Sequence, residues 1–262
     1  MDIKQFVQIW VKSTSGSDWS SAVALGTEIG LDIVSVVPTT TRFYLFFNNG
    51  RLELRENVSG KSAHSGIYVD FLSGSTWFRY KHDRRINQPL ARAVGIKKGV
   101  RPLICDATAG YGVDGFILAS LGCNVTMIER SPVIWALLAD GLKRASEHEE
   151  LSSIIGQNIL LKRGSSDTFL QQADTTFETI YLDPMYPPTK KSALNKRKMR
   201  VLRNLVGEDQ DHAELLERSL KSASARVVVK RPAGAPAIKG PDVSYRLTGK
   251  NSRYDIYLTD HL

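Results

Sequence analysis

The chain has 262 residues, of which 42% are hydrophobic and 24% charged, and its formal net charge is +8. This composition is that of an ordinary globular protein, so long disordered stretches are not expected. The length allows one large domain with a smaller neighbour. The excess of positive charge favours a polyanionic partner or substrate.

Two cysteines, Cys105 and Cys123, lie beside apolar residues and are not spaced as C-x-x-C, so we expect core packing rather than a zinc site or a disulfide. No run reaches the roughly 18 apolar residues of a membrane span, and the N-terminus lacks the pattern of a secretory leader. The sequence therefore predicts a cytoplasmic protein with no membrane segment and no metal.

Residues 1–75 are expected to form a small β-rich region. A strand is predicted over 6–11, and a helix is predicted from Ser17 or Asp18 towards Ile29. Residues 43–54 indicate a hairpin, because Asn48-Asn49-Gly50 supplies the positive φ angles of a tight turn. A further strand is predicted over 68–72.

Residues 76–262 change to strands alternating with helices. The predicted strands are 103–106, 125–129, 159–161, 179–182 and 226–230, and the clearest helices are 114–121 and 132–148, the second capped by Ser131 before Pro132. Two strand-like runs, 244–247 and 254–258, close the chain as a hairpin. This order predicts an α/β fold with a parallel sheet and antiparallel strands at one edge. It resembles the Rossmann-like, seven-stranded sheet of class I methyltransferases.

The first strand-to-helix turn runs from Asp106 through Gly110 and Gly112 to Gly115. Glycines let the backbone approach a ligand, and Glu129, at the end of the next strand, is placed to hold two ribose hydroxyls. The spacing also fits a dinucleotide fingerprint literally, but Asp114 would then lie close to a pyrophosphate. S-adenosylmethionine carries a sulfonium and an ammonium group, so several carboxylates favour that cofactor; an ordinary turn remains the third interpretation.

Ser165 and Ser166 follow the third strand and reach the same edge of the sheet. Their hydroxyls can bond an adenine edge or a ribose, or one of them can cap the helix that begins near Asp167.

The segment Asp183-Pro184-Met185-Tyr186-Pro187 ends the fourth predicted strand. Methylation of an exocyclic amine requires acceptors on its hydrogens, which turn the nitrogen lone pair out of conjugation with the ring. The Asp183 carboxylate and the Pro184 carbonyl can accept these hydrogens, and Tyr186 can stack on a flipped base. Asp-Pro and Tyr-Pro are also ordinary turn dipeptides.

Two basic stretches are candidate RNA contacts. The first follows the Asp183 segment and contains Lys190, Lys191, Lys196, Arg197 and Arg200, and Lys230 ends the fifth strand at the same edge. The second contains Arg79, Lys81, His82, Arg84 and Arg85, flanked by Trp77, Phe78 and Tyr80. A solvated helix face or mobile loop explains the first equally well, and a hinge strand with a solvated edge explains the second.

Taken together, these motifs resemble the ribosomal RNA small subunit methyltransferase J family over about residues 66–258. The motifs that carry the resemblance are Asp106-Ala-Thr-Ala-Gly-Tyr-Gly, Glu129-Arg130-Ser131-Pro132-Val133, Leu182-Asp183-Pro184-Met185-Tyr186-Pro187, Lys191-Ser192-Ala193-Leu194 and Val227-Val228-Val229-Lys230-Arg231-Pro232.

The resemblance implies S-adenosylmethionine-dependent methylation of a guanine N2 in bacterial 16S rRNA, in the cytoplasm. It also implies cofactor contacts at Val113-Asp114, Glu129-Arg130, Ser165-Ser166 and Asp183, beside the Asp106 and Gly110 of the turn. Members of the family carry arginine where this chain has Val113, so the contact there is expected from the backbone.

Three other functions fit parts of the pattern. The same pair of acceptors, at Asp183 and Pro184, also fits the N6 amine of adenine in DNA or RNA. If its cofactor site is vestigial, this chain is a non-catalytic assembly factor that binds rRNA. The literal glycine fingerprint fits a nicotinamide-dependent oxidoreductase.

Overall fold

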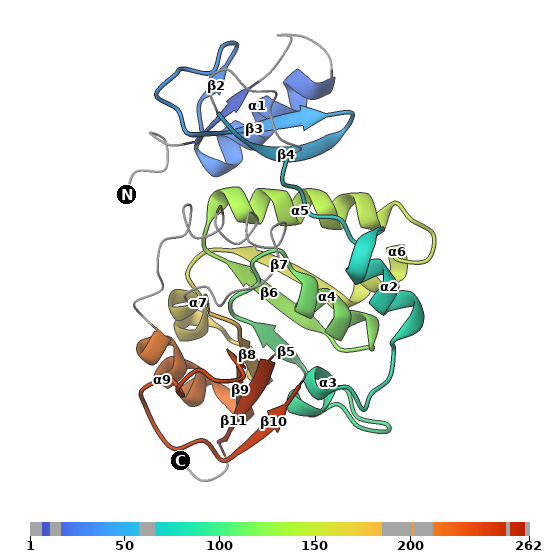
Figure 1. The fold of residues 1–262 in the computed structure, drawn as a ribbon, viewed down its shortest axis with the longest axis vertical. Coiled ribbons are helices and arrows are strands. Elements are labelled where there is room, and N and C mark those ends of the chain that lie inside the picture. Colours follow the sequence, from blue (N-terminus) through green and yellow to red (C-terminus); the bar gives the residue numbers. More distant parts are fainter. Residues whose placement is uncertain are drawn as a thin grey trace.

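The computed structural model describes residues 7–10, 17–57, 66–184, 201, 212–249 and 252–259. They form a four-stranded sheet with the order β2-β1-β3-β4 and a seven-stranded sheet with the order β10-β11-β9-β8-β5-β6-β7 (Figure 1). Within these ranges no helix has the length and apolar character needed to cross a membrane. The same ranges hold no group of three or more His, Cys, Asp and Glu residues that could bind a metal ion.

The small sheet is mixed. Its elements are β1 (Val7–Trp10), α1 (Ser17–Ile29), β2 (Ile33–Val34), β3 (Phe43–Asn48) and β4 (Arg51–Glu56). Strand β1 pairs in parallel with β2 and β3, whereas β3 and β4 form the predicted antiparallel hairpin. Asn49 and Gly50 of its turn have φ angles of 51° and 74°, as the sequence predicts.

The strand predicted over 68–72 is wrong. Ile67 makes one isolated bridge to Leu54, and the chain then turns, because the Asp70 carboxylate accepts the Leu72 N–H at 2.9 Å and the Ser73 hydroxyl at 2.7 Å. Val69 is buried against α5 (Pro132–Ser146), where a Cβ on Gly141 would lie 2.6 Å from Val69 Cγ1. The apolar residues of this segment therefore serve packing on a helix instead of pairing in a sheet.

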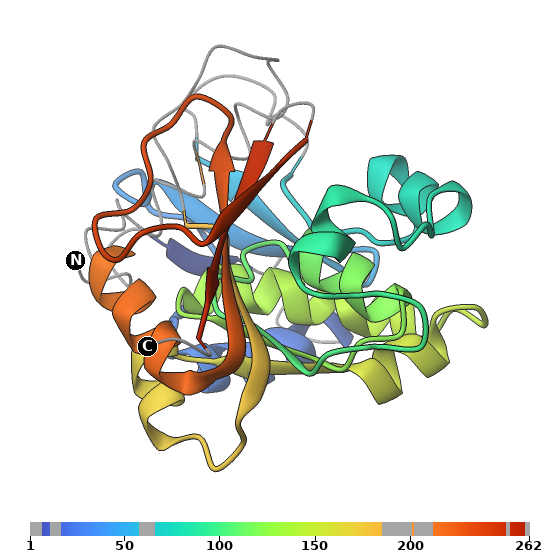
Figure 2. The same cartoon turned by 90° about the horizontal axis from the view of Figure 1, so that it is seen from below.

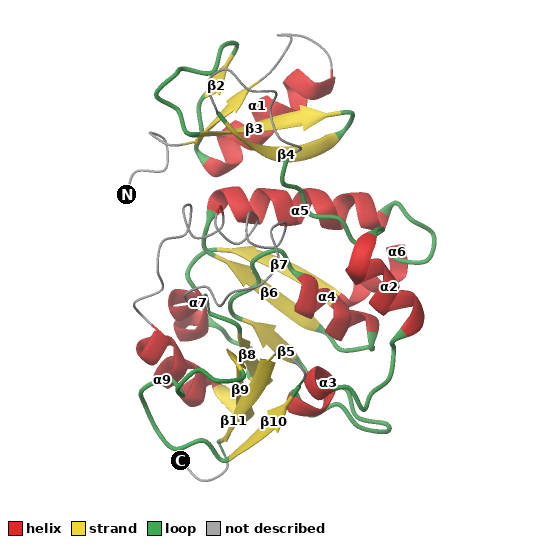
Figure 3. Cartoon of the chain, in the orientation of Figure 1, coloured by secondary structure: helices red, strands yellow, loops and turns green. Residues whose placement is uncertain are grey.

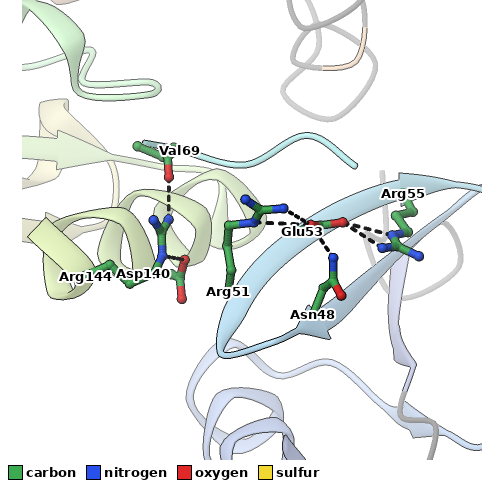
Figure 4. Close-up of polar contacts among 7 residues, drawn as sticks. All are labelled: Asn48, Arg51, Glu53, Arg55, Val69, Asp140 and Arg144. Atoms are coloured by element: carbon green, nitrogen blue, oxygen red, sulfur yellow. Dashed lines mark hydrogen bonds and ion pairs between the residues drawn. The ribbon is translucent and has the colours of Figure 1, made fainter. Parts of the chain in front are cut away.

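A buried carboxylate links β3 and β4 of the small sheet beside α5 (Figure 4). Glu53 is 2% exposed and accepts from Arg51 at 2.5 Å, Arg55 at 2.8 Å and Asn48 at 2.9 Å. On α5, Arg144 bonds Asp140 at 2.9 Å and the Val69 carbonyl.

The large sheet confirms the predicted fold class. Its elements, in chain order after α2 (Gly74–His82) and α3 (Pro89–Ala93), are β5 (Ile104–Asp106), α4 (Val113–Ser120), β6 (Val125–Glu129), α5, α6 (Ser152–Asn158), β7 (Ile159–Arg163), α7 (Ser166–Gln172), β8 (Phe177–Leu182), α9 (His212–Ser222), β9 (Ala223–Pro232), β10 (Tyr245–Thr248) and β11 (Ser252–Leu258). The strands β9, β8, β5, β6 and β7 are parallel, and β11 and β10 add the expected antiparallel edge.

Helices cover both faces of this sheet (Figures 2 and 3). One hydrophobic cluster contains Phe116 of α4 and Leu137 of α5 and continues into the small sheet, whereas the other contains Leu170 of α7 and Leu216 of α9. Cys105 and Cys123 are both fully buried and free, as predicted. The division into regions 1–75 and 76–262 stays a prediction, because its boundary falls inside α2 and the first cluster joins the two sheets.

The hinge strand considered for residues 77–85 is wrong, because Gly74–His82 form helix α2. Thr76 and Tyr80 are four positions apart and both buried, so helical spacing places them on one face. The carboxyl ends of β5, β6, β8 and β9 meet at one edge of the sheet, where open α/β sheets bind ligands.

The Glu53 cluster gives a test of how the small sheet is stabilised. Replacing Glu53 with alanine leaves two arginines without their counter-ion. Their side chains are 33% and 21% exposed, so water limits the cost. We expect the free energy of unfolding to fall by about 2 kcal/mol in urea denaturation. The exposed Glu149→Ala variant is the control, with an expected change within about 0.5 kcal/mol. Equal losses in both variants would contradict the assigned role.

Candidate active site

The glycine turn between β5 and α4 is closely packed. Gly112 precedes α4 with a φ of 72°, and a Cβ on it would lie 2.5 Å from Leu138 Cδ1. A Cβ on Gly115 would lie 2.6 Å from Met127 Cε and 3.1 Å from Asp106 Oδ2. A side chain at Gly112 would push the turn away from α5, and one at Gly115 would push α4 away from β5 and β6, which explains the spacing seen in the sequence.

Glu129 braces this turn. Its Oε2 accepts the Gly110 N–H at 2.9 Å, and its Oε1 accepts the Ser131 N–H at 2.7 Å. The Ser131 hydroxyl accepts the Ile134 N–H at 3.4 Å and so caps α5 as predicted.

Asp106 ends β5 and is 2% exposed. Its Oδ1 accepts the Thr108 N–H at 3.3 Å. Burial, with smaller contributions from the charges of Asp114 and Asp183, raises the pKa of Asp106 to about 8. A neighbouring cation would favour its ionised form.

Ser166 joins a neighbouring loop to the glycine turn. The helix-capping interpretation of the serine pair is wrong for the side chains, since neither Ser165 nor Ser166 makes a capping hydrogen bond to α7. Ser166 is buried, and its hydroxyl donates to the Ala107 carbonyl at 2.5 Å, whereas Ser165 is exposed.

Asp183 follows β8 directly, and its position is fixed from two sides. Its backbone N–H donates to the Thr108 hydroxyl at 2.6 Å, and its Oδ2 accepts from Lys230 Nζ at 2.8 Å. The side chain is 37% exposed. Among the described residues, no hydrogen bond involves Asp183 Oδ1, so this oxygen is available to a ligand.

Lys230, at the end of β9, bridges two carboxylates. Its Nζ also lies 2.7 Å from Asp114 Oδ2, which accepts the Tyr181 hydroxyl at 2.8 Å. Arg79 Nη1 lies 3.6 Å from Asp114 Oδ1. We call Asp114, Tyr181, Asp183 and Lys230 the bridged cluster.

Opposing effects set the charges of this cluster. Burial disfavours the charged form of Asp114, but Lys230 and the Tyr181 hydroxyl outweigh it and lower the pKa of Asp114. Partial desolvation, with the charge of Asp114, raises the pKa of Asp183, and Lys230 limits that rise. The two carboxylates overcome burial and raise the pKa of Lys230. Asp183 is therefore a stronger proton acceptor than an ordinary aspartate.

The structure thus gathers seven of the predicted site residues along one edge of the sheet: Asp106, Gly110, Asp114, Glu129, Ser166, Asp183 and Lys230. Val113 and Arg130 are exposed beside them. Pro184 follows Asp183 within the described residues. The other predicted catalytic and RNA-binding residues lie outside the described residues, namely Tyr186, Lys190, Lys191, Lys196, Arg197 and Arg200.

Sequence reasoning missed Thr108 and Tyr181. Tyr181 and Asp183 are two positions apart at a strand end, so their side chains leave the same face, and this alternation was a usable signal. Thr108 had no such signal, because its contact with Asp183 joins two separate loops.

The residues of the second basic stretch have different surroundings. Lys81 pairs with Glu150, and Arg84 donates to the Ser120 carbonyl at 2.9 Å, so both hold α2 to its neighbours. Arg79 instead faces Asp114, and Arg85 is 78% exposed.

Comparisons with known proteins place this geometry among methyltransferases. A family model described as a putative SAM-dependent methyltransferase matches residues 30–259. The chain is 51% identical over 196 residues to ribosomal RNA small subunit methyltransferase J of Desulfotalea psychrophila, a match that covers 75% of each chain. It is 47% identical over 241 residues to the Marinobacter nauticus protein of that name, covering 90% of this chain and 86% of the other. The crystal structure of a SAM-dependent methyltransferase from Neisseria gonorrhoeae matches with a TM-score of 0.76 and 32% identity over 97% of both chains.

The raised pKa of Asp106 predicts how stability varies with pH. Between its ordinary value of 3.8 and about 8, the folded protein binds this proton more tightly than the unfolded chain does. Stability in the absence of ligand therefore falls as pH rises through this window, by up to about 1.4 kcal/mol per pH unit.

The Asp106→Asn variant lacks this titration. Urea denaturation at several pH values between 5 and 8 should show the wild-type protein losing stability relative to the variant as pH rises. An equal pH dependence of the free energy of unfolding in the two proteins would contradict the assignment of Asp106 as buried and protonated.

Proposed function

The chain belongs to the ribosomal RNA small subunit methyltransferase J family, and from that premise we propose that it methylates the exocyclic N2 of a guanine in bacterial 16S rRNA, free or in the small ribosomal subunit. Its cofactor is S-adenosylmethionine. The proposed place of action is the cytoplasm, where this substrate is assembled.

The residues at the sheet edge fit this cofactor. Four carboxylates, on Asp106, Asp114, Glu129 and Asp183, gather where a ligand with a sulfonium and an ammonium group would lie, and an anionic pyrophosphate would be repelled there. We assign Gly110, Val113 and Arg130 to the same contact surface, with Ser165 and Ser166 at its far end. When bound, S-adenosylmethionine supplies a methyl group activated by the positive sulfur.

The bridged cluster is the observation that carries the proposal. It holds the Asp183 carboxylate at the strand end and leaves Oδ1 available to accept a hydrogen of the guanine amine. A second acceptor, for which we propose the Pro184 carbonyl, would turn the nitrogen lone pair out of the ring system. Tyr186 is proposed to stack on the flipped base, and the basic residues from Lys190 to Arg200, together with Lys230, to approach the RNA.

The proton balance gives Asp183 a second role. The amine nitrogen uses its lone pair for the new N–C bond while the bond between the methyl carbon and the donor sulfur breaks, and the sulfur keeps that electron pair and loses its positive charge. The nitrogen is then positively charged and releases one proton to regain its neutral form. Because the pKa of Asp183 is raised, its carboxylate is suited to accept this proton.

Removing the carboxylate tests this role. We expect Asp183→Ala to lower kcat by at least about 1000-fold, because it removes both the orienting acceptor and the proton acceptor. S-adenosylmethionine should still bind, more weakly, in calorimetry. Asp174→Ala, an exposed aspartate just before β8, is the matched control and should keep wild-type activity.

Nucleoside analysis of methyl-labelled rRNA identifies the product. The proposal requires N2-methylguanosine as the product, whereas N6-methyladenosine would show that the acceptors at Asp183 and Pro184 bind adenine. Full turnover by the Asp183→Ala variant on authentic rRNA would refute the role of this residue.

Lys230 gives a prediction about pH. Its positive charge lowers the pKa of Asp183, so Lys230→Gln should raise that pKa. Methyl transfer needs the ionised form of Asp183, so the rate falls as the pH drops through the pKa of this carboxylate. The acidic limb of the kcat profile should therefore move to higher pH in Lys230→Gln and return towards the wild-type position in Lys230→Arg. An unchanged limb in Lys230→Gln would contradict the charge coupling.

A further inference from the structure

A cavity of about 580 Å³ lies beside the bridged cluster, on the side of β9 and β11. Its lining comes from the α2–α3 segment between residues 79 and 90, from Asp114 and Lys230, and from residues 249–254 around the start of β11. The volume is that of an ordinary small-molecule site. Gly110, Glu129, Ser165 and Ser166 are absent from the described lining, so the cavity extends away from the proposed cofactor surface.

Two kinds of lining suit a nucleotide. Leu90, Pro89 and Tyr254 supply apolar area for a base or ribose, and Leu90 and Tyr254 are only 2% and 7% exposed. Asn87 and Gln88 supply amide groups, which can donate to and accept from base edges.

Charge at the outer end of the cavity suits a phosphate. Arg85 is 78% exposed, and its guanidinium lies 2.8 Å from the Asp83 carboxylate. A pair this exposed contributes little to stability, so the guanidinium can exchange its partner for a phosphate at little cost. Phosphate contacts of this kind dominate affinity for nucleic acids.

We propose that this cavity receives the target nucleotide of a single-stranded RNA segment, with the base against Asp114 and Lys230 and a phosphate at Arg85. The inference rests on the proposed function, and it adds the site at which the substrate binds. Lys230 joins this cavity to Asp183, because Lys230 lines the cavity and its Nζ bonds Asp183 at 2.8 Å. A base that enters beside Lys230 therefore brings its amine towards Oδ1 of Asp183.

The test compares two arginines of the same segment. Arg85 lines the cavity, whereas Arg92 on α3 is also exposed but does not line it. Binding of 16S rRNA is measured at several KCl concentrations for the full-length wild-type protein and for the Arg85→Gln and Arg92→Gln variants. Arg85→Gln should weaken binding and lower the slope of log Kd against log salt by about 0.7, the value for one single-strand phosphate contact. Arg92→Gln should keep the wild-type slope, and both variants should bind S-adenosylmethionine within twofold of wild type.

A second variant tests the cavity by filling it. Asn87 is exposed and lines the cavity, so Asn87→Trp adds a large side chain without replacing a core residue. We expect kcat/KM for rRNA to fall at least tenfold while affinity for S-adenosylmethionine is retained.

The outcomes separate the two proposals. Wild-type slopes in Arg85→Gln with wild-type turnover in Asn87→Trp would overturn the nucleotide site while leaving the methyltransferase assignment intact. Weaker S-adenosylmethionine binding with unchanged RNA binding would assign the cavity to the cofactor and also overturn it. Absence of methyl transfer by the wild-type protein would instead refute the proposed function, and the salt slopes would still decide the RNA contact.

Discussion

The charge arrangement at the end of β8 and β9 is the constraint on which the site depends. Two carboxylates, on Asp114 and Asp183, lie within hydrogen-bond distance of one ammonium group. Without that cation their mutual repulsion and their partial burial would favour protonation of one of them. Lys230 reaches both because β8 and β9 pair in register, with Leu182 opposite Val229, so that the next residues along are Asp183 and Lys230. The register of β8 and β9 thus places the ammonium group that sets the protonation state of the two carboxylates.

The loops around this cluster are cross-linked before any ligand enters. Gly110 is bonded to Glu129, Ser166 to the Ala107 carbonyl, and Asp183 to Thr108. Each bond joins a different pair of loops, so the sheet edge forms one connected polar network. A site held in this way needs little rearrangement to bind its ligands, and more of the binding energy remains for orienting the reacting groups.

Local signals in the sequence were sufficient for much of this architecture. The Asn-Gly hairpin, the Ser131 cap and the alternation of strands and helices depend on neighbouring residues, and they appear where expected. Contacts between distant residues were not predictable in the same way. The Lys230 bridge requires the register of β8 and β9, and the Ser166 bond requires the approach of two loops. The error at residues 68–72 has the same origin, since packing of Val69 on α5 overrides the strand propensity of this segment.

Helix α5 joins the two ends of the molecule. It begins three residues after Glu129, which braces the glycine turn, and near its other end Arg144 bonds the Val69 carbonyl beside the small sheet. The small sheet shares a hydrophobic core with this helix, so the connection is continuous rather than hinged. The small sheet and the ligand-binding edge of the large sheet are consequently packed at the two ends of one helix. A long substrate that touched both would therefore meet two surfaces whose separation is set by the length of α5.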